Sequence, residues 1–195
     1  MKQEEIRQRL IDGTIRVIAR EGLDKATTKH IASETSVNEV YIYRCFENKE
    51  ALFAKTFAAL DEELVSVSLK HASIMYETDI KYDQRCWIFF NGVWRFLLGN
   101  KDKCLTFIRY FYSQYFSRLS SSDHKLRFEP LVEKCSAAFR EEANVWMILN
   151  HIFNVMLDFA VKVYDGDLAD SDDTTEHVFR LVYISVRQYF KKTDV

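Results

Sequence analysis

The sequence is poor in residues that break helices and in cysteines spaced for disulfides. It has five Gly and one Pro, Pro130, in 195 residues. Because Gly and Pro interrupt helices and supply the turns of β folds, their scarcity favours long helices over a turn-rich β protein. The cysteines have no paired spacing, which predicts reduced thiols that act as small buried hydrophobic residues: Cys45, Cys86, Cys104 and Cys135. We therefore expect an all-α protein.

Long apolar runs and the usual motifs of enzymes are also lacking. The chain begins MKQEEIRQRL, which is no secretion signal, and no apolar run approaches the ~18 residues that span a membrane. This predicts a soluble, cytoplasmic protein without a membrane partner. No phosphate-binding loop, nucleophile motif, His-Glu-x-x-His or Cys-x-x-Cys occurs, and the histidines are far apart: His30, His71, His124, His151 and His177. We expect no enzyme, no metal and no cofactor.

Charge alone does not indicate a nucleic-acid partner. Residues 1–50 hold nine Lys or Arg and nine Asp or Glu, and the net charge of −2 arises from the rest of the chain. A basic surface must therefore come from local arrangement.

Short helices near the N-terminus are what the sequence does contain. Apolar residues at helical spacing run from Gln3 to Arg20 and end before Gly22. Thr27 can cap a second helix of about two turns, and Asn38 can cap a third after a break at residues 36–38. The pattern then resumes from residue 48 to about residue 72.

Two short helices joined by a tight turn bury little surface alone, so their value is geometric: one holds the other for insertion into the major groove of DNA. The expected packing residues are Ile31, Ala32, Val37, Ile42 and Phe46. The residues left to point outward or sideways are Glu39, Val40, Tyr41, Tyr43 and Arg44. The segment is therefore interpreted as a helix-turn-helix.

Residues 22–32, GLDKATTKHIA, and 36–53, SVNEVYIYRCFENKEALF, resemble the DNA-binding signature of the TetR family of bacterial regulators. The resemblance covers about fifty residues and implies a ligand-responsive repressor that binds double-stranded operator DNA as a homodimer. It places these residues at DNA: Thr27, Thr28, Lys29, Asn38, Tyr41, Tyr43, Arg44 and Lys49. Tyr41 and Arg44 fall on the recognition helix, and Tyr43 and Lys49 at positions that contact the DNA backbone. Ser36, Val40 and Tyr41 depart from the usual pattern, which leaves the operator sequence open.

For these DNA-facing residues an ordinary alternative exists, in which the tyrosines are packing residues and the cations plain surface charge. For the whole chain, the alternative is a helical protein–protein adaptor without DNA binding. The adaptor would explain amphipathic helices but not the signature of residues 27–53.

The expected domains are a helix-turn-helix domain at 1–47 and an effector-binding and dimerisation domain at 48–195. In the second domain, helices are expected at 79–98, 102–118, 123–140, 142–164 and 174–192, the last capped by Asp173 with Glu176. The final two are apolar on more than one side, so one stripe can face the core and the other a partner chain. The candidate dimer residues are Trp146, Phe153, Leu157, Phe179, Tyr183 and Val186. Helices buried wholly within a monomer are the alternative.

Aromatic residues are concentrated in residues 87–116, with polar residues there and near residue 150. Ligand cavities are mostly apolar with a few placed polar groups. The candidate effector-pocket residues are Trp87, Phe90, Asn91, Trp94, Phe107, Tyr110, Phe111, Gln114, Asn150, His151 and Asn154. They predict a hydrophobic or aromatic small-molecule effector, the alternative being an aromatic core.

Overall fold

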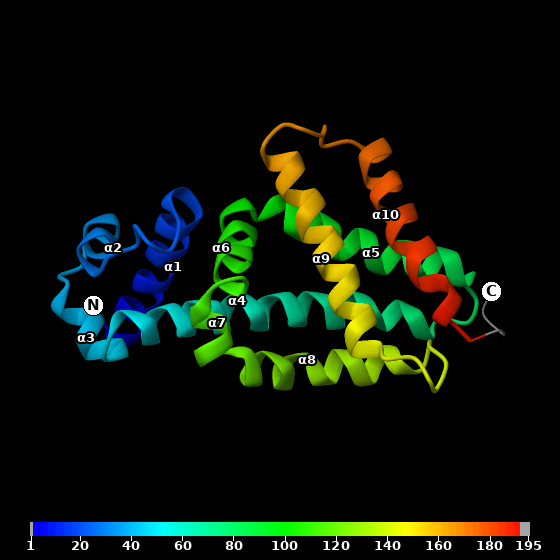
Figure 1. Cartoon of the computed structure of the whole chain (residues 1–195), viewed down its shortest axis with the longest axis horizontal. Helices are drawn as coiled ribbons and strands as arrows, with labels where there is room; N and C mark the ends of the chain where they lie inside the picture. The colour runs from blue at the N-terminus through cyan, green and yellow to red at the C-terminus, as the bar shows by residue number, and fades with distance from the viewer. Residues whose placement is uncertain (1, 192–195) are drawn as a thin grey trace. The chain divides into compact units, whose positions relative to one another are not determined.

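The computed structural model describes residues 2–191, and this part of the chain is all-α, as the sequence predicts. Its helices are α1 (Gln3–Glu21), α2 (Thr28–Thr35), α3 (Val40–Phe46), α4 (Lys49–Ala72), α5 (Tyr82–Gly99), α6 (Lys101–Phe111), α7 (Gln114–Leu119), α8 (Ser121–Ser136), α9 (Val145–Tyr164) and α10 (Asp172–Val186) (Figure 1). Two 3-10 turns, η1 (Ser73–Tyr76) and η2 (Arg187–Tyr189), follow α4 and α10. Within residues 2–191 no strand forms, and Phe139 and Phe190 make an isolated antiparallel bridge.

Serine caps explain two differences from the expected helices. The helix expected at 102–118 is two helices, α6 and α7, because the Ser113 hydroxyl accepts a hydrogen bond from the Phe116 amide and starts a new helix. The last helix is capped by Ser171, whose hydroxyl accepts from the Thr174 amide at 3.1 Å, and not by Asp173 with Glu176. The other expected helices are present with shifted ends.

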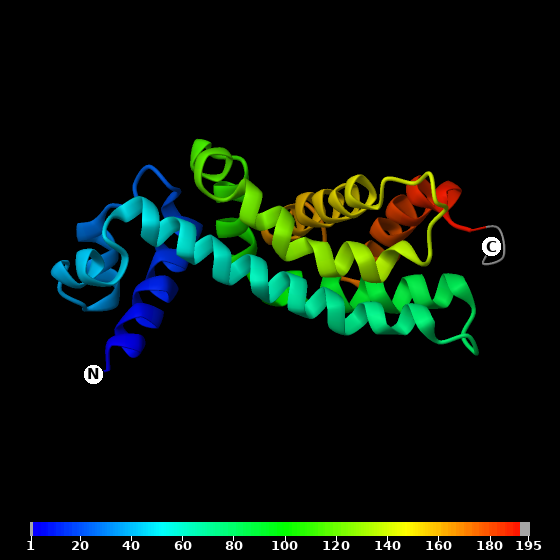
Figure 2. The ribbon, with the colours of Figure 1, turned by 90° about the horizontal axis from the view of Figure 1, so that it is seen from below.

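The chain forms two compact units, each assembled from separate segments. Of the described residues, unit one holds 2–63 together with 100–126, and unit two holds 64–99 together with 127–191. The helices α4 and α8 contribute residues to both units. The helix α4 is one continuous ribbon (Figure 2). The predicted boundary between a DNA-binding domain and an effector and dimer domain, at residues 47 and 48, concerns function and not compactness. It stays a prediction.

The core of unit one is an aromatic cluster on α4, α6 and α8. Phe57 stacks on Tyr110, with ring centroids 4.7 Å apart, and contacts Phe107 at 5.0 Å. Beside these rings the buried Asp61 carboxylate lies 2.9 Å from His124 Nδ1. This cluster packs α6 and α8 against α4, the helix that follows the helix-turn-helix.

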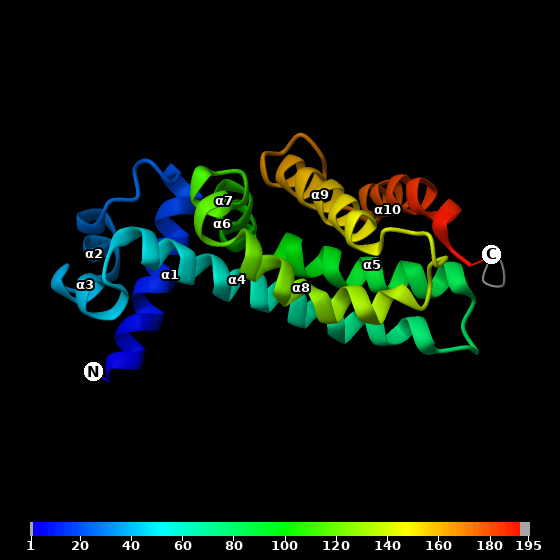
Figure 3. The ribbon, with the colours of Figure 1, turned by 60° about the horizontal axis from the view of Figure 1, so that its bottom comes forward.

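The core of unit two is formed by α5, α9 and α10, and α9 and α10 lie against each other (Figure 3). Trp94 is fully buried and donates through Nε1 to the Thr175 hydroxyl at 3.1 Å. Contrary to the expectation that no such run exists, α9 is long and apolar enough, by length and composition alone, to cross a membrane. Its eight buried residues pack inside the protein, which accounts for its apolar composition.

The four cysteines are free thiols. Cys45, Cys104 and Cys135 are buried as expected, whereas Cys86 is only half-buried.

Candidate nucleic-acid interface and effector cavity

Close packing of α1 against α2 sets the frame of the helix-turn-helix. A Cβ at Gly13 would lie 2.0 Å from the Thr35 methyl group, so this contact requires glycine. Arg16 and Arg20 both hydrogen-bond the Glu34 carboxylate, at 2.8 and 3.1 Å. These hydrogen bonds lower the pKa of Glu34 from its usual range. The helix α2 therefore has a fixed position on α1.

The turn between α2 and α3 is four residues long and closed by local hydrogen bonds. The Thr27 hydroxyl caps α2 by accepting from the His30 amide, as predicted. Ser36 has φ 53°, a left-handed conformation, and its amide donates to the Ala32 and Ser33 carbonyls. The Asn38 side chain accepts from the Val40 amide at 3.0 Å, but the N-cap position of α3 is Glu39, so the predicted cap is one residue too early.

The helix α3 has a buried side and an exposed side. All five residues expected to pack inward are buried: Ile31, Ala32, Val37, Ile42 and Phe46. Val40 and Tyr43 are each 52% exposed, and Arg44 is exposed beside them. The exposed side thus carries aromatic and cationic groups on a helix narrow enough to enter a major groove.

Arg7, on α1, fixes the far end of α3 and was missed by the sequence reasoning. Its Nη1 donates to the Cys45 carbonyl at 2.7 Å, and its guanidinium lies 4.8 Å from the centre of the Phe46 ring. The contact joins residues 38 positions apart, so no local pattern signals it.

Three cations in this region have no carboxylate partner among residues 2–191: Lys29, Arg44 and Lys49. The Arg44 guanidinium lies 5.5 Å from the Tyr41 ring centre, and the Lys49 ammonium lies 5.4 Å from that of Phe53. Aromatic rings hold both cations without neutralising them, so their charge stays available to phosphate or to base edges.

The eight predicted DNA-binding residues come from the start of α2, the turn, α3 and the first residue of α4. Five are exposed, namely Thr27, Lys29, Asn38, Tyr43 and Arg44, and three are half-buried, namely Thr28, Tyr41 and Lys49. Their contact with DNA stays a prediction.

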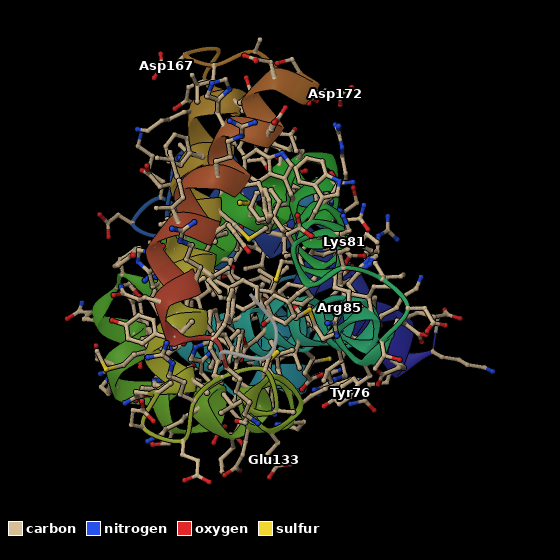
Figure 4. All side chains as sticks on the ribbon, turned by 90° about the vertical axis from the view of Figure 1, so that its right-hand side faces the viewer. Tyr76, Lys81, Arg85, Glu133, Asp167 and Asp172 are labelled. Atoms are coloured by element: carbon tan, nitrogen blue, oxygen red, sulfur yellow. The ribbon has the colours of Figure 1, made fainter. Side chains whose placement is uncertain are left out.

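Unit two contains an apolar cavity that opens to solvent, with about 550 Å³ of atom-free space in and around it, open solvent included. It is lined by Met75, Tyr82, Cys86, Phe89, Phe90, Cys135, Ala138, Phe139, Leu149, Ile152, Phe179, Val182, Tyr183, Val186 and Phe190. Arg85 Nη1 donates to the Met75 carbonyl and the Tyr76 hydroxyl to the Lys134 carbonyl, each at 2.6 Å, which anchors η1 beside the cavity (Figure 4).

Burial disfavours the anionic form of two ionisable groups in the cavity wall, Cys135 and Tyr183. It raises the pKa of the Cys135 thiol to about 12 and the pKa of the Tyr183 hydroxyl above its ordinary value. A wall of this kind favours an uncharged, apolar guest.

The predicted effector residues lie in several places, and only Phe90 lines the cavity. Trp87 and Trp94 stack on Phe90, at 6.3 and 5.9 Å, and the Asn91 side-chain oxygen is buried without a hydrogen-bond partner in the described residues. In unit one, Phe107, Tyr110 and Phe111 belong to the aromatic cluster and Gln114 is exposed. On α9, Asn150 hydrogen-bonds the Trp146 carbonyl, His151 hydrogen-bonds Ser185, and Asn154 is exposed.

The predicted dimer residues are mostly used within the protomer. Phe153, Leu157 and Val186 are buried, Phe179 and Tyr183 line the cavity, and half-buried Trp146 packs on Phe128. The exposed apolar residues of α9 and α10 are Met147, Leu181 and Ile184, at 65%, 54% and 62% exposure. Helical spacing alone did not distinguish the apolar residues that pack inside the protomer from those that are exposed.

Comparisons with known proteins point to one family. Residues 10–56 match the family model of bacterial regulatory proteins of the tetR family. A nicotine-responsive transcriptional repressor with a helix-turn-helix, HdnoR of Paenarthrobacter nicotinovorans, is 42% identical over 59 residues, which are 30% of this chain and 30% of that relative.

Solved structures share the fold over nearly the whole chain. A TetR family transcription regulator of Marinobacter aquaeolei superposes with a TM-score of 0.78 at 15% identity, over 95% of this chain and 98% of its own. A similar regulator of Shewanella sp. gives 0.73 at 14% identity with the same coverage. These findings confirm the resemblance found in the sequence: residues 10–56 carry the signature of bacterial regulatory proteins of the tetR family, and the chain shares the fold of solved TetR family regulators.

Proposed function

We propose that the protein is a transcriptional repressor that binds a near-palindromic operator as a homodimer and is released by a small apolar effector. The observation that carries this is the exposed side of α3, where Tyr43 and Arg44 lie at the surface. Within residues 2–191, Arg44 has no carboxylate partner, and neither do the nearby Lys29 and Lys49. Residues 1–47 would form the DNA-binding domain and 48–195 the effector and dimer domain. Such a protein acts in the cytoplasm, where its operator is.

Phosphate and base contacts divide between neighbouring residues. Lys49 begins α4 and its ammonium is the kind of mobile point charge that binds phosphate. Arg44 presents a planar fork that suits the O6 and N7 acceptors of guanine. Thr27, Thr28, Lys29, Asn38 and Tyr43 would position the helix, and Tyr41 would support Arg44.

The dimer would form through the exposed apolar side chains of α9 and α10. Met147, Leu181 and Ile184 expose more than half their surface, and burial against an identical copy would remove that surface from water. The variant Ile184→Asp places an unpaired charge in this interface and is expected to sediment as a monomer at micromolar concentration. Leu126→Asp, on α8, is the matched control and should remain dimeric. A monomeric unaltered protein contradicts the dimer.

The effector would occupy the cavity of unit two. The cavity lining extends from residue 75 to residue 190, more than a 59-residue match can cover, so the nicotine response of HdnoR gives no guide to the ligand here. The apolar wall favours aliphatic or aromatic molecules. A ligand that prefers the state unable to bind DNA, with a coupling of ~1–3 kcal/mol, would lower operator affinity ~5–150-fold.

Filling the cavity tests that role. Ala138 lines it, whereas its neighbour Ala137 is exposed. Ala138→Phe should abolish ligand-induced stabilisation while leaving DNA binding intact, and Ala137→Phe should change neither. If apolar ligand libraries neither raise the melting temperature nor quench tryptophan fluorescence of the unaltered protein, the effector cavity loses its support.

Operator binding is tested by selecting bound duplexes from a random pool and footprinting the winners. The expected site is a near-palindrome with half-sites about one helical turn apart, or further apart if the two α3 helices are splayed. Recovery of a single asymmetric half-site, or of no preferred sequence, contradicts the proposal.

A further inference from the structure

Glu39 is an acidic residue at the start of the helix proposed to read DNA. Its backbone already has helical dihedral angles, φ −52° and ψ −32°, and its carbonyl accepts from the Ile42 amide at 2.9 Å. Its side chain is half-buried, and Oε1 accepts a hydrogen bond from the Thr28 hydroxyl, on α2, at 2.5 Å. Both the backbone and one carboxylate oxygen are therefore fixed.

The charge of Glu39 is not neutralised within the protein. Among residues 2–191 no Lys, Arg or His pairs with it, in contrast to Glu34, which is held by two arginines. Phosphates repel a carboxylate, so this side chain cannot serve as a backbone contact. Its second oxygen, Oε2, remains an acceptor that only a hydrogen-bond donor can satisfy.

In the major groove, only two bases offer such a donor. Cytosine presents its N4 amino group, and adenine presents its N6 amino group beside the N7 acceptor. The N7 lone pair repels a carboxylate, as do the acceptors of guanine and thymine. Cytosine is therefore the base that an anionic acceptor favours.

We propose that Glu39 is a specificity-determining residue that accepts a hydrogen bond from cytosine N4, and that Thr28 is a positioning residue that orients its carboxylate. The inference rests on the proposed operator binding and names one base pair in each half-site. The predicted operator has C at that position on the strand Glu39 faces.

The test is selection from a random duplex pool with the unaltered protein and with Glu39→Gln. Glutamine keeps the length of the side chain and an oxygen for Thr28, but its amide suits adenine N6 and N7. The variant is expected to replace the selected C by A at one symmetric position. Its affinity for the original operator should fall about 5–150-fold.

Two further variants separate base reading from charge and from folding. Glu47→Gln removes a negative charge at the other end of α3 and should raise affinity for all sequences with the base preference unchanged. Thr28→Val should weaken the discrimination for C over other bases, and Thr28→Ser, which keeps the hydroxyl, should restore it.

A direct readout uses the unaltered protein on altered DNA. In a second experiment the selected cytosine is replaced by thymine, which presents O4 in place of the N4 donor. The operator affinity of the unaltered protein should then fall by the same factor of about 5–150, and the affinity of Glu39→Gln should fall much less. If the unaltered protein selects an operator that Glu39→Gln also selects unchanged, the inference is overturned while the proposed function stands. If the unaltered protein selects no sequence, both are overturned.

Discussion

The buried pair of Asp61 and His124 should be one of the largest single contributions to the stability of unit one. The Asp61 side chain is fully buried, the His124 side chain is 5% exposed, and Nδ1 and Oδ1 are 2.9 Å apart. The Phe57, Phe111 and Phe116 rings surround the imidazole at 5.4–5.9 Å, so water has little access. Replacing Asp61 by Ala deletes this buried hydrogen bond, at a cost of ~1–3 kcal/mol.

That cost is a large share of the ~5–15 kcal/mol by which domains are stable. Asp61→Ala should lower the urea midpoint by about 1 M, for a denaturant slope of about 2 kcal/mol/M. Glu63→Ala is the matched control on the same helix. Its ion pair with Lys103, at 2.6 Å, is more than one-third exposed, so its removal should cost only ~0–1 kcal/mol. Equal midpoints for the two variants would refute the reasoning.

Three further predictions concern other parts of the protein. Arg109→Met removes hydrogen bonds to carbonyls in the last turn of α1 and should lower the free energy of unfolding by ~1.5–3 kcal/mol. Amide hydrogen exchange in that turn should become faster, and an unchanged exchange rate contradicts the prediction. Gly92→Ala puts a Cβ 2.3 Å from the His71 ring and should lower the melting temperature, whereas addition of His71→Ala restores it; a Gly92→Ala protein more stable than the original disproves the clash. Because the folded protein keeps the Cys135 proton up to a pKa of about 12, against 9.0 for a free thiol, its unfolding free energy should fall as pH rises from about 9 towards 12, by at most about 1.4 kcal/mol per unit. In Cys135→Ala, the unfolding free energy from urea titrations should fall less steeply between pH 9 and 10.5 than in the unaltered protein. The same dependence on pH in both proteins counts against the prediction.

Short-range signals made the helix-turn-helix predictable from sequence. Thr27 and Asn38 act within three residues of themselves, and a two-turn helix has few ways to bury Ile31 and Ile42. Interactions across long stretches of chain, such as that of Arg7 with α3, leave no such signal.

The cavity was harder to predict because the spacing of apolar residues along a helix does not show which other helix its apolar face packs against. The aromatic residues of α5 and α6 are adjacent in sequence, yet the compact units divide between Gly99 and Asn100. Phe90 therefore lines the cavity while Phe107 belongs to a different core. The break at Ser113 was also missed, because apolar residues continue at helical spacing through it.

The central claim is that α3 and the start of α4 read DNA, and the most direct measurement is operator affinity as a function of salt for Lys49→Ala and Arg44→Ala. Lys49→Ala should weaken binding to the selected operator and to scrambled DNA about equally, and reduce the log–log salt slope by about 1 for each phosphate that the protein no longer neutralises. Arg44→Ala should cost ~1–3 kcal/mol on the operator alone and relax preference at one base pair. Unchanged affinity and salt slope in Lys49→Ala, with no sequence preference in the unaltered protein, would contradict the account.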